Sequence, residues 1–401
     1  MSEDTRLRTP AVRRTSAGAL HVVGVDRAEH QELYVSADAP QGCAATVGAD
    51  AAEIYGDVSR VLAEHQAVVV QERLYGTLAA QEAAETARAA AVAGSPAFGG
   101  APPTYLEGRP ACGDGLCGVH LCAVSAEREA PLLHGDRTLG RLIRTSGATY
   151  VYLNGLAGTS PQVAVPRVEQ ATRMFDTAHE ILGNLGCDYR DVVRTWIYIG
   201  EILDWYDDFN LARNECYTRY GLLGRGDDYL PASTGIQARP PGHLELTMDL
   251  LAVRPSEGSG VRCGRLFNPL QNEAYAYGSA FARAMEVVAD GARTVYISGT
   301  ASIDEFGKSI HEDDIEAQIV RTVKNVEALI GTSGLGLQDI CQATIFLKDA
   351  AYIEPFYTLC AGTPLAELGI CMVADVCRAD LLFEIDAVAA GLVQPSENTR
   401  A

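Results

Sequence analysis

The 401-residue sequence lacks the features that mark several large classes of protein. No apolar run approaches the ~18 residues that a transmembrane helix needs, so we expect no membrane association. Positive charge is also scarce, because 32 lysines and arginines stand against 52 acidic residues, a formal net charge of −20. This excess of negative charge disfavours partners such as nucleic acids and anionic membrane surfaces. An anionic small molecule would need arginines concentrated at one site.

The first 18 residues are rich in arginine, serine and threonine, and they lack the apolar segment of a secretory signal. We predict that residues 1–18 form a disordered tail. Eleven cysteines without a secretory signal are typical of reduced thiols in a cytoplasmic protein.

Motifs for metal ions and nucleotides are likewise missing. Cys112, Cys117 and Cys122 are spaced too widely for a zinc knuckle, and no paired CxxC or HxxH accompanies them. The glycine-rich stretch 94–115 contains no phosphate-binding loop and no GxGxxG before a helix. We therefore expect no metal and no cofactor.

What the sequence does contain is a pattern of strands and helices that occurs three times. The middle copy is predicted to hold, in order, a strand, a helix, a strand, a helix and a strand at 151–158, 168–184, 192–199, 205–220 and 244–253. The last copy repeats this order at 295–302, 315–330, 340–347, 353–360 and 381–389.

The N-terminal third contains a less complete version of the pattern, with a strand, a helix and two strands at 33–38, 51–65, 68–75 and 116–125. Its second helix is expected to be replaced by the Ala/Glu-rich stretch 79–93 and a Gly/Pro loop. Alternating strands and helices often form a parallel sheet, but tight turns here also allow a mixed sheet with helices on one face. We predict an α+β protein of three similar units, 19–135, 136–256 and 270–392, folded as an intrachain pseudo-trimer.

The final strand carries the strongest candidate for a functional residue, Glu384. Side chains alternate along a strand, so Glu384 and Asp386 share one face. Burial of a carboxylate costs several kcal/mol unless it is paired or protonated, and this cost raises its pKa toward that of a useful general acid. Alignment of the closing strands places Thr247 and Val119 at the position of Glu384, whereas Asp386 aligns with Asp249. The unshared Glu384 indicates a specialised site, although a hydrogen-bonded strand-end acid is the alternative.

Three motifs of the last copy, VYISG at 295–299, IFL at 345–347 and LFEIDAVA at 382–389, resemble the YjgF-like reactive-intermediate deaminase superfamily. Members of that superfamily are homotrimers with sites at subunit interfaces. Their deaminase site pairs the final-strand Glu with an Arg that would fall near Gly369 here. Because that arginine is absent, the resemblance does not predict hydrolysis of enamines or imines.

Further motifs resemble the chorismatases, which place superfamily-like units in one long chain. PASTGI at 231–236 is the most specific of them, and the resemblance covers roughly residues 139–390. The other motifs are FNLAR at 209–213, YGSAFAR at 277–283, ISGTAS at 297–302 and FEID at 383–386.

Chorismatases release pyruvate from chorismate, and Glu384 matches the carboxylate that serves as their acid and base. Cleavage of an enol ether begins with protonation of its methylene carbon, a step suited to a carboxylic acid kept protonated by an apolar setting. Hydrolytic members then use water and form a dihydroxycyclohexadiene carboxylate, whereas others form 3-hydroxybenzoate. Cys377, seven residues before Glu384, matches the cysteine of the second group and so predicts 3-hydroxybenzoate. A thiol that merely packs is the alternative.

The resemblance also indicates residues that would bind the substrate. Arg283 and Arg213 lie in family-like motifs and are expected to hold the two substrate carboxylates, because arginine binds carboxylates in a bidentate manner. Arg378 and Arg239 are weaker candidates. The remaining expected pocket residues are Tyr277, Ser298, Gly299 and Thr300, with Thr234 and Gly235 from the neighbouring unit.

The sequence thus predicts an enzyme that converts chorismate to 3-hydroxybenzoate and pyruvate, as a starter for secondary metabolism. Two alternatives remain open: a hydrolytic chorismatase, and a non-catalytic protein of the superfamily that binds a small molecule. Chorismate is the one partner predicted. The chain is expected to be a monomer, as a pseudo-trimer, or a weak homo-oligomer.

Overall fold

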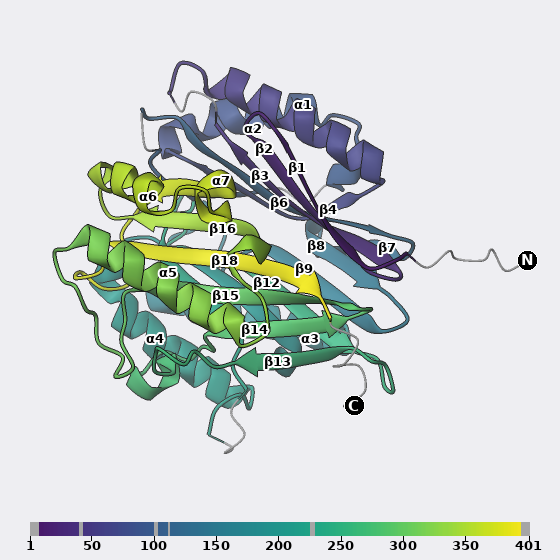
Figure 1. Ribbon diagram of the computed structural model, residues 1–401. Helices are drawn as coiled ribbons and strands as arrows, with labels where there is room; N and C mark the ends of the chain where they lie inside the picture. The colour runs from purple at the N-terminus through teal and green to yellow at the C-terminus, as the bar shows by residue number, and fades with distance from the viewer. Residues whose placement is uncertain (1–7, 40–42, 100–102, 111–112, 225–228, 394–401) are drawn as a thin grey trace, which may run out of the picture.

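Three six-stranded sheets of the same strand order make up the protein in the computed structural model (Figure 1). The structure describes residues 8–39, 43–99, 103–110, 113–224 and 229–393. The first sheet has the order β1-β2-β3-β6-β4-β5, the second β7-β8-β9-β12-β10-β11 and the third β13-β14-β15-β18-β16-β17. The prediction of an α+β fold built from three similar units is confirmed.

Each unit begins with three antiparallel strands, continues through helices, and ends with the strand that occupies the sheet interior. The N-terminal unit contains β1 (Ala11–Ala17), β2 (Leu20–Asp26), β3 (His30–Asp38), α1 (Val47–His65), β4 (Val68–Gly76), α2 (Gln81–Ala91), β5 (Thr104–Glu107) and β6 (Leu116–Ala126). The middle unit contains β7 (Glu129–His134), β8 (Arg137–Arg144), β9 (Ala148–Leu156), α3 (Arg167–Asn184), β10 (Val192–Ile199), α4 (Ile202–Arg219), β11 (Ala232–Gln237) and β12 (Leu246–Pro255).

The C-terminal unit contains β13 (Arg262–Leu266), β14 (Ala284–Ala289), β15 (Ala292–Ala301), α5 (Ile315–Gly331), β16 (Ile340–Leu347), α6 (Ile353–Leu359), α7 (Pro364–Leu368), β17 (Gly369–Val373) and β18 (Phe383–Leu392). The edge strands β5, β11 and β17 pair in parallel with β4, β10 and β16. A parallel pair needs a crossover connection, which the second helical segment of each unit supplies.

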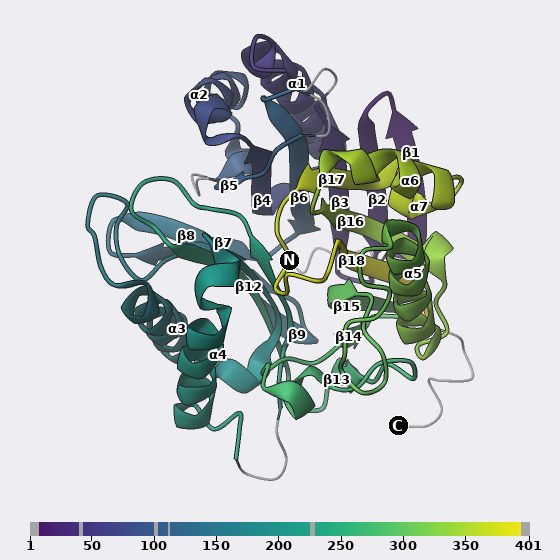
Figure 2. The same cartoon turned by 90° about the vertical axis from the view of Figure 1, so that its left-hand side faces the viewer.

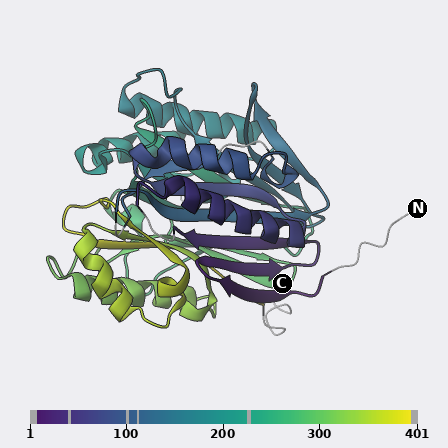
Figure 3. The same ribbon diagram turned by 90° about the horizontal axis from the view of Figure 1, so that it is seen from above.

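The helices of each unit lie on the outside of the molecule, and the three sheets face one another (Figure 2). Seen from above, the purple and blue helices of the N-terminal unit lie over its own strands (Figure 3). Apolar residues on one face of each sheet therefore pack against the helices, whereas those on the other face meet the neighbouring sheets.

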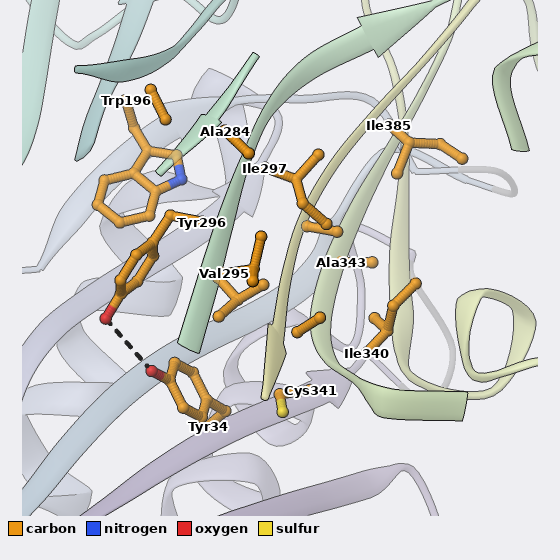
Figure 4. Packing of buried hydrophobic residues seen from close by; sticks show 14 of the residues in the cluster. Tyr34, Trp196, Ala284, Val295, Tyr296, Ile297, Ile340, Cys341, Ala343 and Ile385 are labelled. Atoms are coloured by element: carbon orange, nitrogen blue, oxygen red, sulfur yellow. Dashed lines mark hydrogen bonds between the residues drawn. The ribbon is translucent and has the colours of Figure 1, made fainter. Parts of the chain in front are cut away.

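Tyrosines at equivalent ladder positions mark the centre where the sheets meet. Tyr34, Tyr152 and Tyr296 are all buried, and each pairs with the closing strand of its own unit. The hydroxyl oxygens of Tyr34 and Tyr296 are 3.5 Å apart (Figure 4). Burial raises the pKa of all three phenols, so they stay neutral and form part of the shared core.

A buried carboxylate joins the N-terminal and middle units. Asp249 of β12 accepts hydrogen bonds from Arg73 Nε at 2.7 Å and from Thr104 Oγ1 at 2.8 Å, both in the N-terminal unit. The backbone N–H of Gly155 donates to the same carboxylate at 2.9 Å. These bonds offset the desolvation of both charges, and they connect two strands that are far apart in the sequence.

Three details of the predicted organisation were wrong. Ala11–Ala17 form β1 rather than a tail, because Gly18 adopts a φ of 60° and turns the chain into a hairpin with β2; residues 1–7 lie outside the described residues. The Ala/Glu-rich stretch 79–93 forms the helix α2, as its helix-favouring composition allows. Strands β7 and β13 begin before residues 136 and 270, at which the middle and C-terminal units were predicted to start.

The ladder also corrects one position in the alignment of closing strands. The residue equivalent to Glu384 in the N-terminal unit is Gly118, not Val119. The pairings that define this equivalence are Glu384 with Phe346, Thr247 with Tyr198 and Gly118 with Tyr75. Val119 points to the opposite face and packs in the core beneath α1, because a shift of one residue changes the face of a strand.

None of the described helices is long and apolar enough to cross a membrane. The ten cysteines within the described ranges are free thiols.

Loss of the buried carboxylate at Asp249 should destabilise the fold strongly. Asp249→Ala leaves the Arg73 guanidinium buried without its ion-pair partner, and such a loss costs about 3–5 kcal/mol in the free energy of unfolding. Asp57→Ala, which removes the partner of the exposed Arg60, should cost less than about 1 kcal/mol. Chemical denaturation of the two variants beside wild type measures the difference. Equal losses would contradict the assignment of Asp249 as the interface carboxylate.

Candidate active site

Glu384 lies in the interior of the C-terminal sheet, where β18 runs between β15 and β16. It pairs with Ala301 on one side and with Phe346 on the other. The residue is 4% exposed, and no hydrogen bond or ion pair reaches its carboxylate from the described residues. A buried carboxylate without such a partner favours its protonated form.

Gly299 of β15 makes room for this carboxylate. A Cβ at Gly299 would overlap Oε1 of Glu384 and would stand 3.4 Å from Cγ2 of Thr234. Thr234 belongs to β11 of the middle unit, so Glu384 lies at the interface of two units. Ser298 holds the same interface together, because its hydroxyl accepts a hydrogen bond from the Ser233 N–H at 2.8 Å.

The surroundings of Glu384 favour a neutral carboxylic acid at pH 7. Burial is the largest cause, followed by the negative charge of Asp386, and together they raise the pKa of Glu384 to about 8. Arg194, Arg283 and Arg378 act in the opposite direction but do not outweigh burial. The site therefore offers a proton donor rather than a carboxylate base.

Asp386, two residues further along the same face, is held by the middle unit. Its Oδ2 accepts hydrogen bonds from Arg194 at 2.7 Å and from Thr234 Oγ1 at 2.6 Å. The indole of Trp196 lies under the Arg194 guanidinium, 4.6 Å from its ring centroid. This arrangement repeats that of Asp249 at the other interface, so both aligned aspartates join two units.

Cys377 lies in the segment between β17 and β18 and packs against the core of the middle unit. The residue is half-buried. Burial, and then the charge of Glu384, raises the pKa of its thiol to about 12, so the thiol is neutral at pH 7. Among the charged groups that act on this thiol, Glu384 has the largest effect.

A pocket of about 400 Å³ opens beside Cys377, between α4 of the middle unit and the C-terminal unit. Glu384 is not among the residues that line it, whereas Cys377 contributes to both the pocket and the surroundings of Glu384. The lining residues are Tyr206, Asp207, Asn210, Leu211, Asn214, Gly278, Ser279, Cys377 and Arg378.

Two buried arginines flank the ring of Phe281 near this pocket. The guanidinium carbon of Arg213 lies 5.8 Å from the ring centroid and that of Arg283 lies 5.7 Å from it. Arg213 donates to Oδ1 of Asn210 at 2.5 Å, and no carboxylate in the described part of the chain forms an ion pair with it. Arg283 donates to the Asn272 carbonyl. Arg213 is therefore a buried cation without a counter-charge among the described residues, which favours binding of an anion.

Two other predicted site residues use their hydroxyl groups within the protein. The hydroxyl of Ser298 donates to the Ala282 carbonyl and that of Thr300 to the Ser298 carbonyl, and both residues are fully buried. These bonds support the backbone beside Glu384, where β15 continues as a strand with a ladder irregularity. Contact of either residue with a substrate stays a prediction.

The remaining candidates divide between the site and other places. Gly235 lies against the ring of Tyr206, a pocket residue. Arg378 donates to the Gly307 carbonyl and also lines the pocket. The backbone of Arg239 lies at the interface with the N-terminal unit, where its carbonyl accepts from the Glu107 N–H, and a role of its side chain in the site stays a prediction. The side chain of Tyr277 lies outside the described residues.

Sequence reasoning missed Arg194, Asn210 and Phe281. Asn210 had a detectable signal, because it stands three residues before Arg213 on a predicted helix and so shares its face. Arg194 had none, since its partner Asp386 is 192 residues away.

Comparison with known proteins agrees with this architecture. The family model described as Endoribonuclease L-PSP matches residues 279–391. The 3-hydroxybenzoate synthase of Streptomyces hygroscopicus is 31% identical over 288 residues, covering 64% of this chain and 77% of that protein. A chorismatase of Streptomyces rapamycinicus is 28% identical over 247 residues, covering 55% of this chain and 68% of that protein.

A chorismatase crystal structure superimposes with a TM-score of 0.59 at 20% identity, covering 80% of this chain and 93% of that one, which shows the shared fold. The match to the 3-hydroxybenzoate synthase shows more than a shared fold, because it spans most of that protein at 31% identity. The chain belongs to the chorismatase family, within the YjgF-like superfamily.

Proposed function

We propose that this protein cleaves chorismate to 3-hydroxybenzoate and pyruvate. The observation that carries the proposal is the buried, unpaired Glu384, a neutral acid that only one of the three equivalent closing strands possesses. The two Streptomyces relatives, named for chorismate cleavage and for 3-hydroxybenzoate formation, support the choice of substrate.

In the first step Glu384 donates its proton to the methylene carbon of the enolpyruvyl ether. The positive charge that develops on the ether is stabilised by the glutamate carboxylate that remains, with Asp386 near it. The C–O bond to the ring then breaks and pyruvate leaves. Gly299 allows the carboxyl group to reach its position, and no cofactor is needed for the step.

Arg213 and Arg283 bind the two carboxylates of the substrate in this proposal. Both guanidinium groups are buried around Phe281, where the attraction to an anion is less screened than in water. Arg213 has no acidic partner among the described residues, so a substrate carboxylate would supply the missing charge. Phe281 separates the two cations and provides an apolar surface for the ring.

The fate of the ring depends on what attacks it as pyruvate leaves. In the proposed route the oxygen of the neighbouring ring hydroxyl bonds to the ring carbon that pyruvate leaves, and the hydroxyl proton passes to the Glu384 carboxylate. The three-membered ether then opens at the bond between the oxygen and its original carbon while Glu384 returns a proton to the oxygen. Loss of one ring proton to Glu384 gives aromatic 3-hydroxybenzoate without addition of water, so Glu384 gives two protons and recovers two. Cys377 occupies space beside Glu384 with a neutral thiol, which supports exclusion of water from the developing cation.

Replacement of Glu384 by glutamine should abolish most of the activity while leaving the fold intact. General acids contribute about 10²–10⁴-fold to rates, so kcat for pyruvate release should fall by at least about 10². Purified wild type and Glu384→Gln are incubated with chorismate, and the ring product is identified by mass. Glu316→Gln, on the first turn of α5, is the control and should retain full activity.

Pyruvate with a dihydroxycyclohexadiene carboxylate would retain chorismate cleavage and refute the 3-hydroxybenzoate product. Absence of pyruvate from the wild type, with equal ligand binding by both proteins, would instead indicate a non-catalytic binding protein.

The rate should decline in alkaline solution. Glu384 has to be protonated to act as an acid, and its pKa is raised to about 8, so kcat should be level below pH 8 and fall about tenfold per pH unit above it. Initial rates between pH 6 and pH 10 measure this limb. A rate that rises with pH through this range would show that the carboxylate acts as a base.

Replacement of Cys377 should change the product more than the rate of pyruvate release. Cys377→Ala opens a space beside Glu384 that water can occupy, so the hydrolytic dihydroxy product should appear beside 3-hydroxybenzoate. Cys263→Ala, a change at another half-buried thiol on β13, is the matched control and should form 3-hydroxybenzoate alone. An unchanged product from Cys377→Ala would assign that thiol to packing.

A further inference from the structure

A second, smaller pocket lies at the interface of the N-terminal and middle units. Its volume is about 130 Å³, and it is bounded by β5, β9 and the segment that precedes β12. The lining residues that can be compared with the candidate active site are Thr104, Leu139, Asn154, Gly155, Pro240 and Thr247. It shares no residue with the pocket beside Cys377.

The ladders show that this pocket is the pseudo-symmetric counterpart of the candidate active site. Thr247 occupies the position of Glu384, as their equivalent pairing partners show. Gly155 corresponds to Gly299. In each unit the pairing with the closing strand is interrupted by an irregularity, and the glycine stands directly before the residue at which pairing resumes. Thr104 of β5 corresponds to Thr234 of β11, since both donate to the interface aspartate of the next unit.

The residues proposed for chemistry are replaced in the counterpart. Leu139 occupies the position of Arg283, because each stands one residue before the first residue that pairs with the next strand. Pro240 lies seven residues before Thr247, as Cys377 does before Glu384. Thr247 has no acidic proton, and its hydroxyl donates to the Leu156 carbonyl at 3.0 Å. The scaffold of the site is therefore retained without its acid.

The third interface carries different side chains at the corresponding positions. Gly118 occupies the Glu384 position there, and Ile370 of β17 pairs with Thr344 as Thr234 pairs with Trp196. A Cβ at Gly118 would stand 3.0 Å from Cδ1 of Ile370. The threonine and the polar lining of the second pocket are thus not a necessary result of the symmetry.

Asn154 gives the second pocket an unsatisfied polar group. The residue is 8% exposed and its Nδ2 donates to the Val70 carbonyl at 2.8 Å. That bond identifies the remaining amide atom as the acceptor Oδ1, which has no hydrogen-bond partner among the described residues. Leaving a buried acceptor unpaired costs about 1–3 kcal/mol, so a donor from a bound molecule would be favourable here.

Charged side chains at the same pocket limit what that molecule can be. Arg137 lines the pocket, is exposed, and forms no ion pair with a described residue. Glu85 lines it as well and accepts from Gln81 at 3.1 Å. A carboxylate can therefore bind to Arg137, and a hydrogen-bond donor on the same molecule would satisfy Oδ1 of Asn154.

We infer that the second pocket binds a small carboxylic acid that carries a hydroxyl or ammonium group on the neighbouring carbon, without converting it. The volume of about 130 Å³ is below that of pockets for drug-sized ligands, which suits a molecule of only a few heavy atoms. The inference concerns binding and does not depend on chorismate cleavage.

Isothermal titration calorimetry of the full chain with L-lactate and with L-serine tests this inference. Lactate offers the hydroxyl and serine the ammonium donor, so binding of either supports the site and their comparison identifies the donor. Pyruvate, a related acid without a donor on that carbon, should bind at least tenfold more weakly. Failure of both acids to bind would overturn the inference.

Two variants locate the binding. Arg137→Gln removes the carboxylate partner and Asn154→Ser withdraws the buried acceptor, and each should weaken the acid that binds by at least tenfold. Arg262→Gln, the same change at an exposed arginine of β13, is the matched control and should leave the affinity unchanged. Binding that persists at full strength in both site variants would place the acid elsewhere and refute the assignment.

Discussion

The packing of three sheet faces against one another is the constraint on which the rest of the structure depends. Every polar group on those faces is removed from water and has to find a partner or become neutral. Asp249 and Asp386 satisfy this requirement with arginine and threonine from the adjacent unit, and so they also join the units. Glu384 receives no such partner from the described residues and is kept protonated instead.

The three units share one fold, but the side chains at equivalent positions differ among the three interfaces between them. The interface between the middle and C-terminal units holds an acid, a thiol and two buried arginines. The interface between the N-terminal and middle units holds a small polar pocket with threonine in place of the acid. Between the C-terminal and N-terminal units glycine stands in place of the acid and Ile370 in place of the threonine. Since the three sheets share one strand order, the differences between the interfaces arise from side chains.

The repeat and the position of Glu384 could be predicted because both rest on local patterns. Alternation along β18 defines which face the acid occupies, and comparison of three closing strands shows that it is unshared. The closing-strand alignment failed only at Val119, one residue from the true equivalent Gly118, and an error of one residue is enough to exchange the two faces of a strand. The roles of Ser298 and Thr300 could not be predicted, because a hydroxyl that supports a backbone and one that faces a pocket look the same in a sequence.

The sequence by itself determined the three units, the family resemblance and the acid at Glu384, since these depend on periodicity and on motifs of a few residues. Only the tertiary structure decided that Arg194 holds Asp386, that Arg213 and Arg283 flank Phe281, and that the backbone of Arg239 lies at another interface. It also decided that Asn154 lines a second pocket. Contacts of this kind join residues from different units, and their energies depend on burial and distance that no local pattern specifies.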